Sequence, residues 1–418
     1  MRRFANACGG DRVLALFALA VGVFFFFLPL RTDATATILI MAVLAAAAGR
    51  NSGAYTFMRK GLRSIPLFAF AFFMLVALVA SLSNPPTLTK FPRILLWGCC
   101  VFSGITLSIC VAGNGGKYFW ALFAAIGLSF LVAVVFLGYG SPDIWHDGRL
   151  KLFAMHPSRL GLYAAVCLFF LLFRTLAGAG WERLLGLVGA LLVLFILVNT
   201  NTRANLLMLP LGLLCLGVVL PRRYWKRMAA ALILCAVLGG VALTMSNSFA
   251  VKRLVSAVTN PLEDSNFKSR LPIWHIGWES FKTAPLFGHG HQGYLKLHER
   301  YLAEHREEME ARFPGFEPRI KQAHNIILGR LVETGVAGTA GFLLFYLGAI
   351  AAAWRGPAGN RWLLAPLIFY MGMSMFDDGL FRINDAFILF LGGTALGGLA
   401  PCGGQTGRQG RDPLRGCP

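Results

Sequence analysis

The chain has 418 residues, of which 56% are hydrophobic and only 14% are charged. This charged share is about half of that in soluble proteins, so the composition excludes an ordinary soluble globular protein. The formal net charge is +20, but no compact basic segment carries it. This distribution argues against nucleic-acid binding.

Long apolar runs predict transmembrane helices, because a span needs about 18 or more residues with few charges. We expect an all-α polytopic membrane protein with about twelve spans. The first run follows a basic start, as in a signal peptide, but a second run follows at once, so we expect it to be retained. The expected spans begin near Val13, Thr35, Pro66, Arg93, Tyr118, Leu160, Leu184, Ala204, Met228, His324, Trp362 and Ala386.

The Lys and Arg residues predict the orientation in a bacterial inner membrane. With a cytoplasmic N-terminus, the short inner segments hold more of them than the short outer loops do, as the positive-inside rule requires. Both termini are therefore expected in the cytoplasm, and anionic lipids are expected partners of the basic residues. The expected division is the first nine spans over 1–246, a periplasmic loop subdomain over 247–323, the last three spans over 324–400 and a disordered cytoplasmic tail over 401–418.

The periplasmic segment contains a helical pattern from Gly293 to Arg312. Its polar residues surround a single apolar face, so we expect a solvated amphipathic helix over the outer membrane surface. The apolar positions are Tyr294, Leu297, Tyr301 and Met309.

The sequence before this helix is PLFGHGHQGY, whose glycines predict a tight turn. His289 and His291 form an HxH pair, which without further ligands is weak evidence for a metal site. None of the nine cysteines lies in the periplasmic segment, so no disulfide is expected there. No CxxC or Cys/His spacing typical of a metal site occurs either.

Ionisable residues reach the expected outer membrane boundary in four separate segments. Such groups are expensive to desolvate and are often functional, although arginines near helix ends also commonly extend to lipid head groups. Arg203 stands in a very short turn with nothing polar after it, so its guanidinium needs a partner in protein, lipid or substrate. The residues are Arg149, Lys151, Arg159, Arg203, Arg270, Asp378 and Arg382.

A histidine marks the expected start of the tenth span. If the helix begins near Ala323, His324 lies in its first turn, with Gly335 and Gly338 within about 20° and 40° of it on the helical wheel. Glycines permit close helix approach, so this face should point into the protein. His324 could then accept a proton; the alternative is a structural histidine hydrogen-bonded to a loop. Arg330 and Glu333, on the other side, either pair or mark a helix break.

The pattern H-N-x9-G-x-x-G, from His324 to Gly338, resembles the signature of bacterial O-antigen ligases. That signature has His, then Asn, Ser or Gln, nine residues, Gly, two residues, and Gly, Thr or Tyr. Other features are also similar to this family: about twelve spans, the motif R-L-P-x-W…P-L-x-G-x-G-x-x-x-Y in the periplasmic segment, and an arginine that opens a span in NTRANLL. The resemblance covers most of the chain in architecture and the region from Arg203 to Gly338 in motifs.

The resemblance implies a glycosyltransferase that moves a polysaccharide from undecaprenyl pyrophosphate to lipid A–core on the outer leaflet. It leads us to expect His324 as the general base, with Arg203 and Arg270 holding the pyrophosphate, because guanidinium groups are permanently charged, forked donors. We expect inverting transfer that uses no cofactor and no obligatory metal, and helix packing at Gly335 and Gly338. Asp378 is also a candidate to orient His324. The further candidates for substrate binding are Asn325, Arg149, Lys151, Arg159, Asp378 and Arg382.

Two alternatives stay open at this point. An O-antigen polymerase or a protein O-oligosaccharyltransferase would use the same donor and differ in the acceptor. A transporter would also suit the number of spans, but the sequence contains no inverted repeat of broken helices and little charge at mid-membrane depth. The polysaccharide, the acceptor sugar and the oligomeric state do not follow from the sequence.

Overall fold

The computed structural model describes residues 12–27, 35–52, 54–61, 64–90, 92–110, 118–142, 144–146, 148–152, 156–230, 233, 237, 265–315, 323–376 and 383–399. Within these ranges the chain is almost entirely helical. A short antiparallel pair of strands, β1 (Trp145–His146) and β2 (Arg149–Leu150), is the exception.

Six of the described helices are long and apolar enough to cross a membrane. A seventh candidate is α3 (Thr35–Ser52) joined to α4 (Ala54–Gly61), with a bend of 93° between them. The chain is thus a multi-pass, all-α membrane protein, but the expected twelve spans are not confirmed. The six helices are α5 (Ile65–Ser83), α7 (Pro92–Cys110), α8 (Phe119–Leu137), α9 (Pro157–Ala177), α10 (Trp181–Asn199) and α18 (Ile326–Arg355).

Several other expected spans correspond to shorter apolar helices among the described residues. The short apolar helices are α2 (Arg12–Phe27), α11 (Arg203–Val219), α19 (Leu364–Ser374) and α20 (Ile383–Gly397). Their described lengths are below the 18 residues of a full span, and α2 and α20 adjoin residues that the structure does not describe. The expected span near Met228 lies largely outside the described residues.

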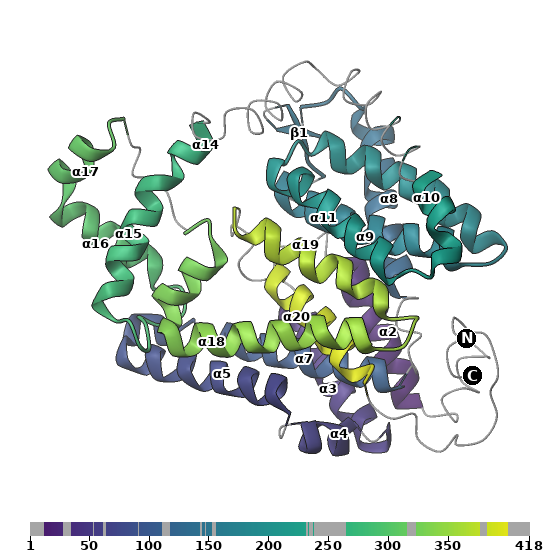
Figure 1. The fold of residues 1–418 in the computed structure, drawn as a ribbon, viewed down its shortest axis with the longest axis horizontal. Helices are drawn as coiled ribbons and strands as arrows, with labels where there is room; N and C mark the ends of the chain where they lie inside the picture. The colour runs from purple at the N-terminus through teal and green to yellow at the C-terminus, as the bar shows by residue number, and fades with distance from the viewer. Residues whose placement is uncertain are drawn as a thin grey trace.

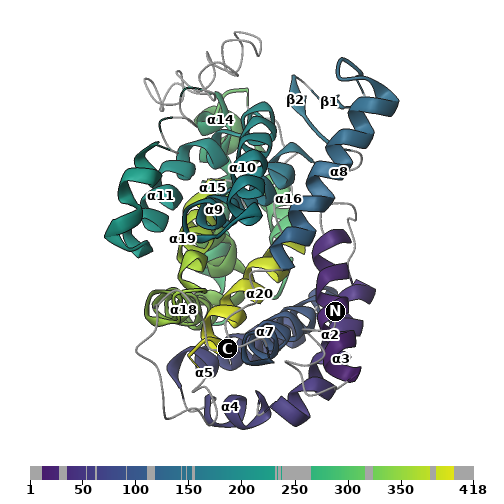
Figure 2. The same ribbon diagram turned by 90° about the vertical axis from the view of Figure 1, so that its right-hand side faces the viewer.

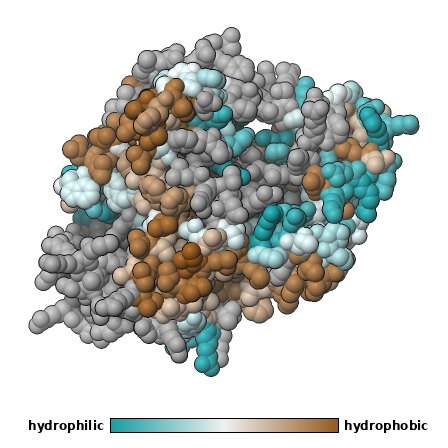
Figure 3. Space-filling view, turned by 180° about the vertical axis from the view of Figure 1, so that it is seen from behind, coloured by the Kyte–Doolittle hydropathy of each residue, from teal (hydrophilic) through white to brown (hydrophobic). Residues whose placement is uncertain are grey.

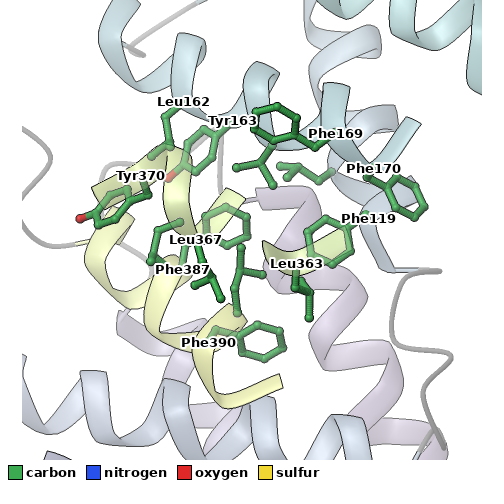
Figure 4. Packing of buried hydrophobic residues seen from close by; sticks show 14 of the residues in the cluster. Phe119, Leu162, Tyr163, Phe169, Phe170, Leu363, Leu367, Tyr370, Phe387 and Phe390 are labelled. Carbon is green, nitrogen blue, oxygen red and sulfur yellow. The ribbon is translucent and has the colours of Figure 1, made fainter. Parts of the chain in front are cut away.

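The helices form two groups that share a core. α5, α7 and most of α18 run side by side across the lower part of Figure 1, and α8 to α11 form the upper right group. α9 is buried along nearly its whole length, and Figure 2 shows it among its neighbours. Figure 4 shows how aromatic side chains from α8, α9 and α20 meet in the core: Phe119, Phe170 and Phe387.

Four short helices form the described part of the segment between α11 and α18, here called the outer subdomain. The expected helix from Gly293 to Arg312 is divided at His305, whose ψ of 32° is not helical. Its apolar face is confirmed, because Tyr294, Leu297 and Met309 are buried. Hydrophilic residues gather on this side of the molecule (Figure 3). The helices are α14 (Ser265–Lys268), α15 (Arg270–Thr283), α16 (Tyr294–Glu304) and α17 (Arg306–Arg312).

The outer subdomain packs on α18 through a small apolar cluster. Tyr294 and Leu297 of α16 and Ile273 of α15 lie against Val332 of α18. The Tyr294 hydroxyl also donates to the Ile273 carbonyl over 2.9 Å. The helix from Tyr294 is therefore docked on α15 and α18 rather than lying free over the membrane.

Glycines bring α7 and α20 into close contact. A Cβ at Gly104 would overlap the backbone of Phe390 and Thr394, and one at Gly393 would overlap the Val101 carbonyl. Small residues of this kind are the usual means of close helix packing in membranes, where burial in lipid gives little driving force.

We expect Gly104→Leu to lower the free energy of unfolding in detergent by about 1–3 kcal/mol, because the side chain would force α7 and α20 apart. Thermal unfolding of the purified protein measures the change. Gly22→Ala is the matched control, since a Cβ there meets nothing within 4 Å. An equal loss in both variants would contradict the packing argument.

Candidate functional site

His324 lies just before α18 and not in its first turn, so the sequence prediction was wrong in this detail. Asn325 is the N-cap: its Oδ1 accepts from the Leu328 N–H over 3.0 Å, and its Nδ2 donates to the Met375 carbonyl over 3.3 Å. Asparagine is among the strongest N-caps, which is why the helix starts after it. Both side-chain ends of Asn325 thus have structural partners.

The backbone of His324 adopts an unusual conformation. Its φ is 49°, in the left-handed region, and its side chain is half-buried. Non-glycine residues occupy this region rarely, and such residues cluster at functional sites. The positive φ turns the chain immediately before the helix. His324 therefore does not belong to any of the side-chain faces of α18.

Gly335 breaks α18 into two parts. Its φ of 62° and ψ of −169° are not helical. Gly335 and Gly338 therefore do not continue a regular helical face below His324, and the helical-wheel prediction was wrong. A Cβ at Gly335 would overlap the backbone of Leu286 and Phe287, whereas one at Gly338 would come within 3.2 Å of Val76 on α5. Only Gly338 thus serves the expected contact with another span.

A loop of the outer subdomain fills the break. The N–H groups of Val336 and Ala337 donate to the carbonyls of Pro285 and Leu286, over 2.8 and 3.2 Å. In the opposite sense, the N–H groups of His289 and Gly290 donate to the carbonyls of Val332 and Glu333, each over 2.9 Å. We call residues 285–290 the inserted loop. It satisfies the backbone groups that the broken helix exposes, as a membrane environment demands.

A buried cluster of charges lies beside the break. Arg330, 1% exposed, donates to Glu333 over 2.9 Å and to Asp385 of α20 over 2.8 Å. Asp385 also accepts from the Tyr370 hydroxyl of α19. The guanidinium carbon lies 4.7 Å from the centroid of the Trp97 ring on α7. One arginine therefore joins α18, α20 and, through its ring contact, α7.

Glu333 extends this cluster to the chain that follows the inserted loop. Its Oε1 accepts from the Gln292 N–H over 2.8 Å, and its Oε2 lies 3.3 Å from His291 Nδ1. The Gln292 side chain in turn accepts from Arg93 of α7 over 2.8 Å. Arg330 and Glu333 therefore form an ion pair and also lie next to a helix break. The sequence analysis gave these as alternatives, and both are present in the structure.

The HxH histidines have separate surroundings. His289 Nε2 lies 2.8 Å from Thr283 Oγ1 and 3.0 Å from the Ser280 carbonyl, and burial lowers its pKa. His291 faces Glu333 instead. Among the described residues, no group of three or more His, Cys, Asp or Glu is placed to hold a metal ion.

Arg270 is joined to the His324 segment through α15. It is the first residue of that helix, and Trp274 stands one turn later on the same side. The Trp274 indole donates to the carbonyl of Ala323, directly before His324, over 3.0 Å. The helix that Arg270 begins is therefore hydrogen-bonded to the residue before His324.

Arg203 begins α11 as predicted. Further predicted basic residues lie at or before the start of α9, which contacts the start of α11. The turn before Arg203 is buried and polar, and Asn205 Nδ2 donates to the Ser158 carbonyl at the start of α9 over 3.1 Å. Arg159 lies in that first turn of α9, and Arg149 and Lys151 lie on the chain that leads into it. Asp378 and Arg382 lie outside the described residues.

α19 contacts both the helix that Arg203 begins and the residue after His324. It packs against α11, and the Met375 carbonyl after its end receives the Asn325 amide. The sequence analysis did not predict that His291, Tyr370 and Asp385 belong to the buried charge cluster. Asp385 had a usable signal, since a carboxylate at the start of an apolar span needs a partner.

Part of the chain matches a known protein family. Residues 188–343 match the family model described as O-antigen ligase, and this range contains Arg203, Arg270, His324 and the broken part of α18. A comparison with curated proteins gave no match. Residues 188–343 are therefore similar to the O-antigen ligase family.

Proposed function

We propose that the chain is an O-antigen ligase, which moves O-antigen polysaccharide from undecaprenyl pyrophosphate to lipid A–core. The reaction takes place on the periplasmic face of the inner membrane, with both termini in the cytoplasm. The supporting observation is the placement of His324 outside α18, in a strained backbone conformation and linked through Ala323 and Trp274 to the helix that Arg270 begins.

The proposed reaction is a direct displacement at the anomeric carbon. His324 accepts the proton of an acceptor sugar hydroxyl, whose oxygen forms the new glycosidic bond as the bond to the pyrophosphate breaks. The undecaprenyl pyrophosphate leaves with the bonding electrons, and the anomeric configuration inverts. Arg203 and Arg270 stabilise the negative charge that develops on the leaving group, without a metal or another cofactor.

The other basic residues are proposed to bind phosphates of the donor or of the anionic lipid A–core. Arg149, Lys151 and Arg159 stand near Arg203 at the same end of α8 to α11, and Arg382 stays a candidate from the sequence. We assign Asn325 to positioning His324 rather than to substrate binding, because its side chain caps α18 and reaches Met375. Asp378 keeps its proposed role in orienting His324.

The buried charge cluster is proposed to hold this site in shape. Arg330 ties α18 to α20 through Asp385, and Glu333 ties α18 to the residues after the inserted loop. His324 stands six residues before Arg330 and two before the start of the same helix. A shift of the first part of α18 would therefore displace the proposed base, and small misplacements are costly for catalysis.

The acceptor separates the proposed reaction from its alternatives. The purified protein is supplied with undecaprenyl-pyrophosphate-linked glycan, with and without lipid A–core. Glycan joined to lipid A–core supports the ligase. Longer lipid-linked glycan without that acceptor would instead indicate a polymerase, and glycan on an added peptide a protein oligosaccharyltransferase.

In this assay we expect His324→Asn to lose transfer by about 100-fold or more, because it removes the base. Asparagine tolerates a positive φ, so the backbone turn is retained and the thermal midpoint should stay close to that of the wild type. His305→Ala, in the outer subdomain, is the control with normal transfer. An active His324→Asn protein would refute the assignment of His324 as the general base.

Arg203→Ala and Arg270→Ala are expected to lose most transfer, and the lysine variants to keep a part of it, because a lysine retains charge but not the forked geometry. Binding of the lipid-linked donor should weaken in parallel. Arg300→Ala, at a side chain that is 64% exposed, serves as the control. Unchanged donor binding in all four variants would refute the pyrophosphate assignment.

Arg330→Gln is expected to lower the free energy of unfolding by about 3–5 kcal/mol, because it leaves two buried carboxylates without their cation. The double variant with Asp385→Asn should be less destabilised than Arg330→Gln alone, since one of these charges is removed. Thermal unfolding in detergent gives both values. Arg306→Gln, in an exposed pair with Glu310, should change little. Simple additivity of the Arg330 and Asp385 effects would contradict the coupling.

A further inference from the structure

The inserted loop presents apolar side chains that the described protein leaves uncovered. Leu286 is 57% exposed and Phe287 is 46% exposed. Trp278, on the outward side of α15, is 50% exposed, and its ring lies 5.2 Å from that of Phe281. We call Trp278, Leu286 and Phe287 the apolar edge. Exposed apolar patches of this kind mark contact with a partner or a membrane.

The apolar edge lies level with the end of α5. The Asn84 side chain, directly after α5, donates to the His289 carbonyl over 2.8 Å, and the His291 N–H reaches Ser81 in its last turn over 3.5 Å. Since α5 is one of the six candidate spans, its end marks the boundary of the membrane. The inserted loop therefore lies at this boundary.

Two exposed apolar stripes run from this boundary down α5 and α18. The two helices pack against each other, and each exposes one side-chain row at helical spacing, as lipid-facing helices do. We call these rows the lipid-facing wall. On α5 the row is Ile65, Phe68, Phe72, Leu75, Val79 and Leu82; on α18 it is Val336, Ala340, Leu344, Leu347, Ala351 and Trp354.

The inserted loop closes the top of this wall. Its Leu286 carbonyl accepts from the Ala337 N–H, next to Val336, the uppermost member of the α18 row. From Val336 to Arg355 the helix has about 20 residues and a length of about 30 Å, which matches the hydrocarbon core of a bilayer. The break at Gly335 thus coincides with the outer limit of the hydrocarbon, and the first part of α18 extends beyond it.

We propose that the apolar edge inserts among the acyl chains of the outer leaflet and anchors the outer subdomain to the bilayer. The occupant is bulk phospholipid, because Leu286 and Phe287 lie directly beside Gly335 and Val336, at the top of the exposed apolar row of α18. Trp278 has the amphipathic ring common at membrane boundaries. This inference is independent of the reaction catalysed.

The anchor has a structural consequence for the outer subdomain. Trp278 and Arg270 belong to the same helix, and Trp274 between them binds the carbonyl before His324. Lipid contact at one end of α15 therefore sets the height of its other end above the bilayer. Arg270 and His324 are held at a defined distance from the lipid surface.

The test adds one fluorophore to the apolar edge. Phe287→Trp is reconstituted in phosphatidylcholine vesicles free of polyprenyl lipids, and its signal is the difference from the wild type, which has nine tryptophans. Phospholipid brominated in the upper part of its acyl chains should quench most of this added fluorescence, and aqueous iodide should quench little. Leu286→Trp is the second variant and should behave in the same way.

Glu307→Trp is the matched control, because Glu307 is exposed on α17, in the polar part of the outer subdomain. Its fluorescence should respond to iodide and not to brominated lipid. Quenching of Phe287→Trp by iodide alone would overturn the anchor. Protection from both quenchers would show that protein covers the edge and would also overturn it. Loss of the bromine quenching on addition of undecaprenyl phosphate would assign the edge to the polyprenyl chain instead.

Discussion

The backbone hydrogen bonding at Gly335 is the constraint on which the site depends. A helix broken near the membrane boundary exposes N–H and C=O groups that lipid cannot satisfy. The inserted loop supplies partners on both sides of the break, with four hydrogen bonds to residues 332–337. Because the backbones approach so closely, Gly335 and Gly288 cannot carry a side chain. The loop motif PLFGHG therefore pairs with the break in α18, although the two are separated in sequence by α16 and α17.

The buried charge cluster fixes how the inserted loop and the neighbouring helices are arranged around the break in α18. Arg330 alone would be costly to bury, and it is compensated by two carboxylates from different helices. Glu333 then binds the backbone of Gln292, so the same cluster holds the chain that leaves the inserted loop. The packing of α5, α7, α18 and α20 and the position of the outer subdomain are therefore coupled through a few side chains. Such a junction can hold a reaction site at a constant height over a fluid bilayer.

The proposed site draws its residues from three separate parts of the chain. Arg203 comes from the start of α11, Arg270 from the start of α15 and His324 from the segment before α18. All three stand at helix starts, where exposed N–H groups and the helix dipole favour anions. α19 links these parts, because it contacts α11 and the Met375 carbonyl after its end accepts from Asn325. This arrangement suits a donor whose pyrophosphate lies close to the membrane surface.

The sequence by itself determined the membrane class, most helix positions, the amphipathic face of the outer subdomain and the candidate residues, because these depend on hydropathy, periodicity and local motifs. It placed Arg203 correctly at a helix start, since a short polar turn precedes an apolar run. It misplaced His324 and Gly335, because a helical wheel assumes an unbroken helix and cannot register an N-cap at Asn325 or a loop that enters from elsewhere. Only the tertiary structure decided the partners of Arg330, the contact of His291 with Glu333 and the contact of the inserted loop with the end of α5. Those features rest on contacts between residues far apart in the chain, and no local pattern specifies which distant backbone will satisfy a buried charge or a broken helix.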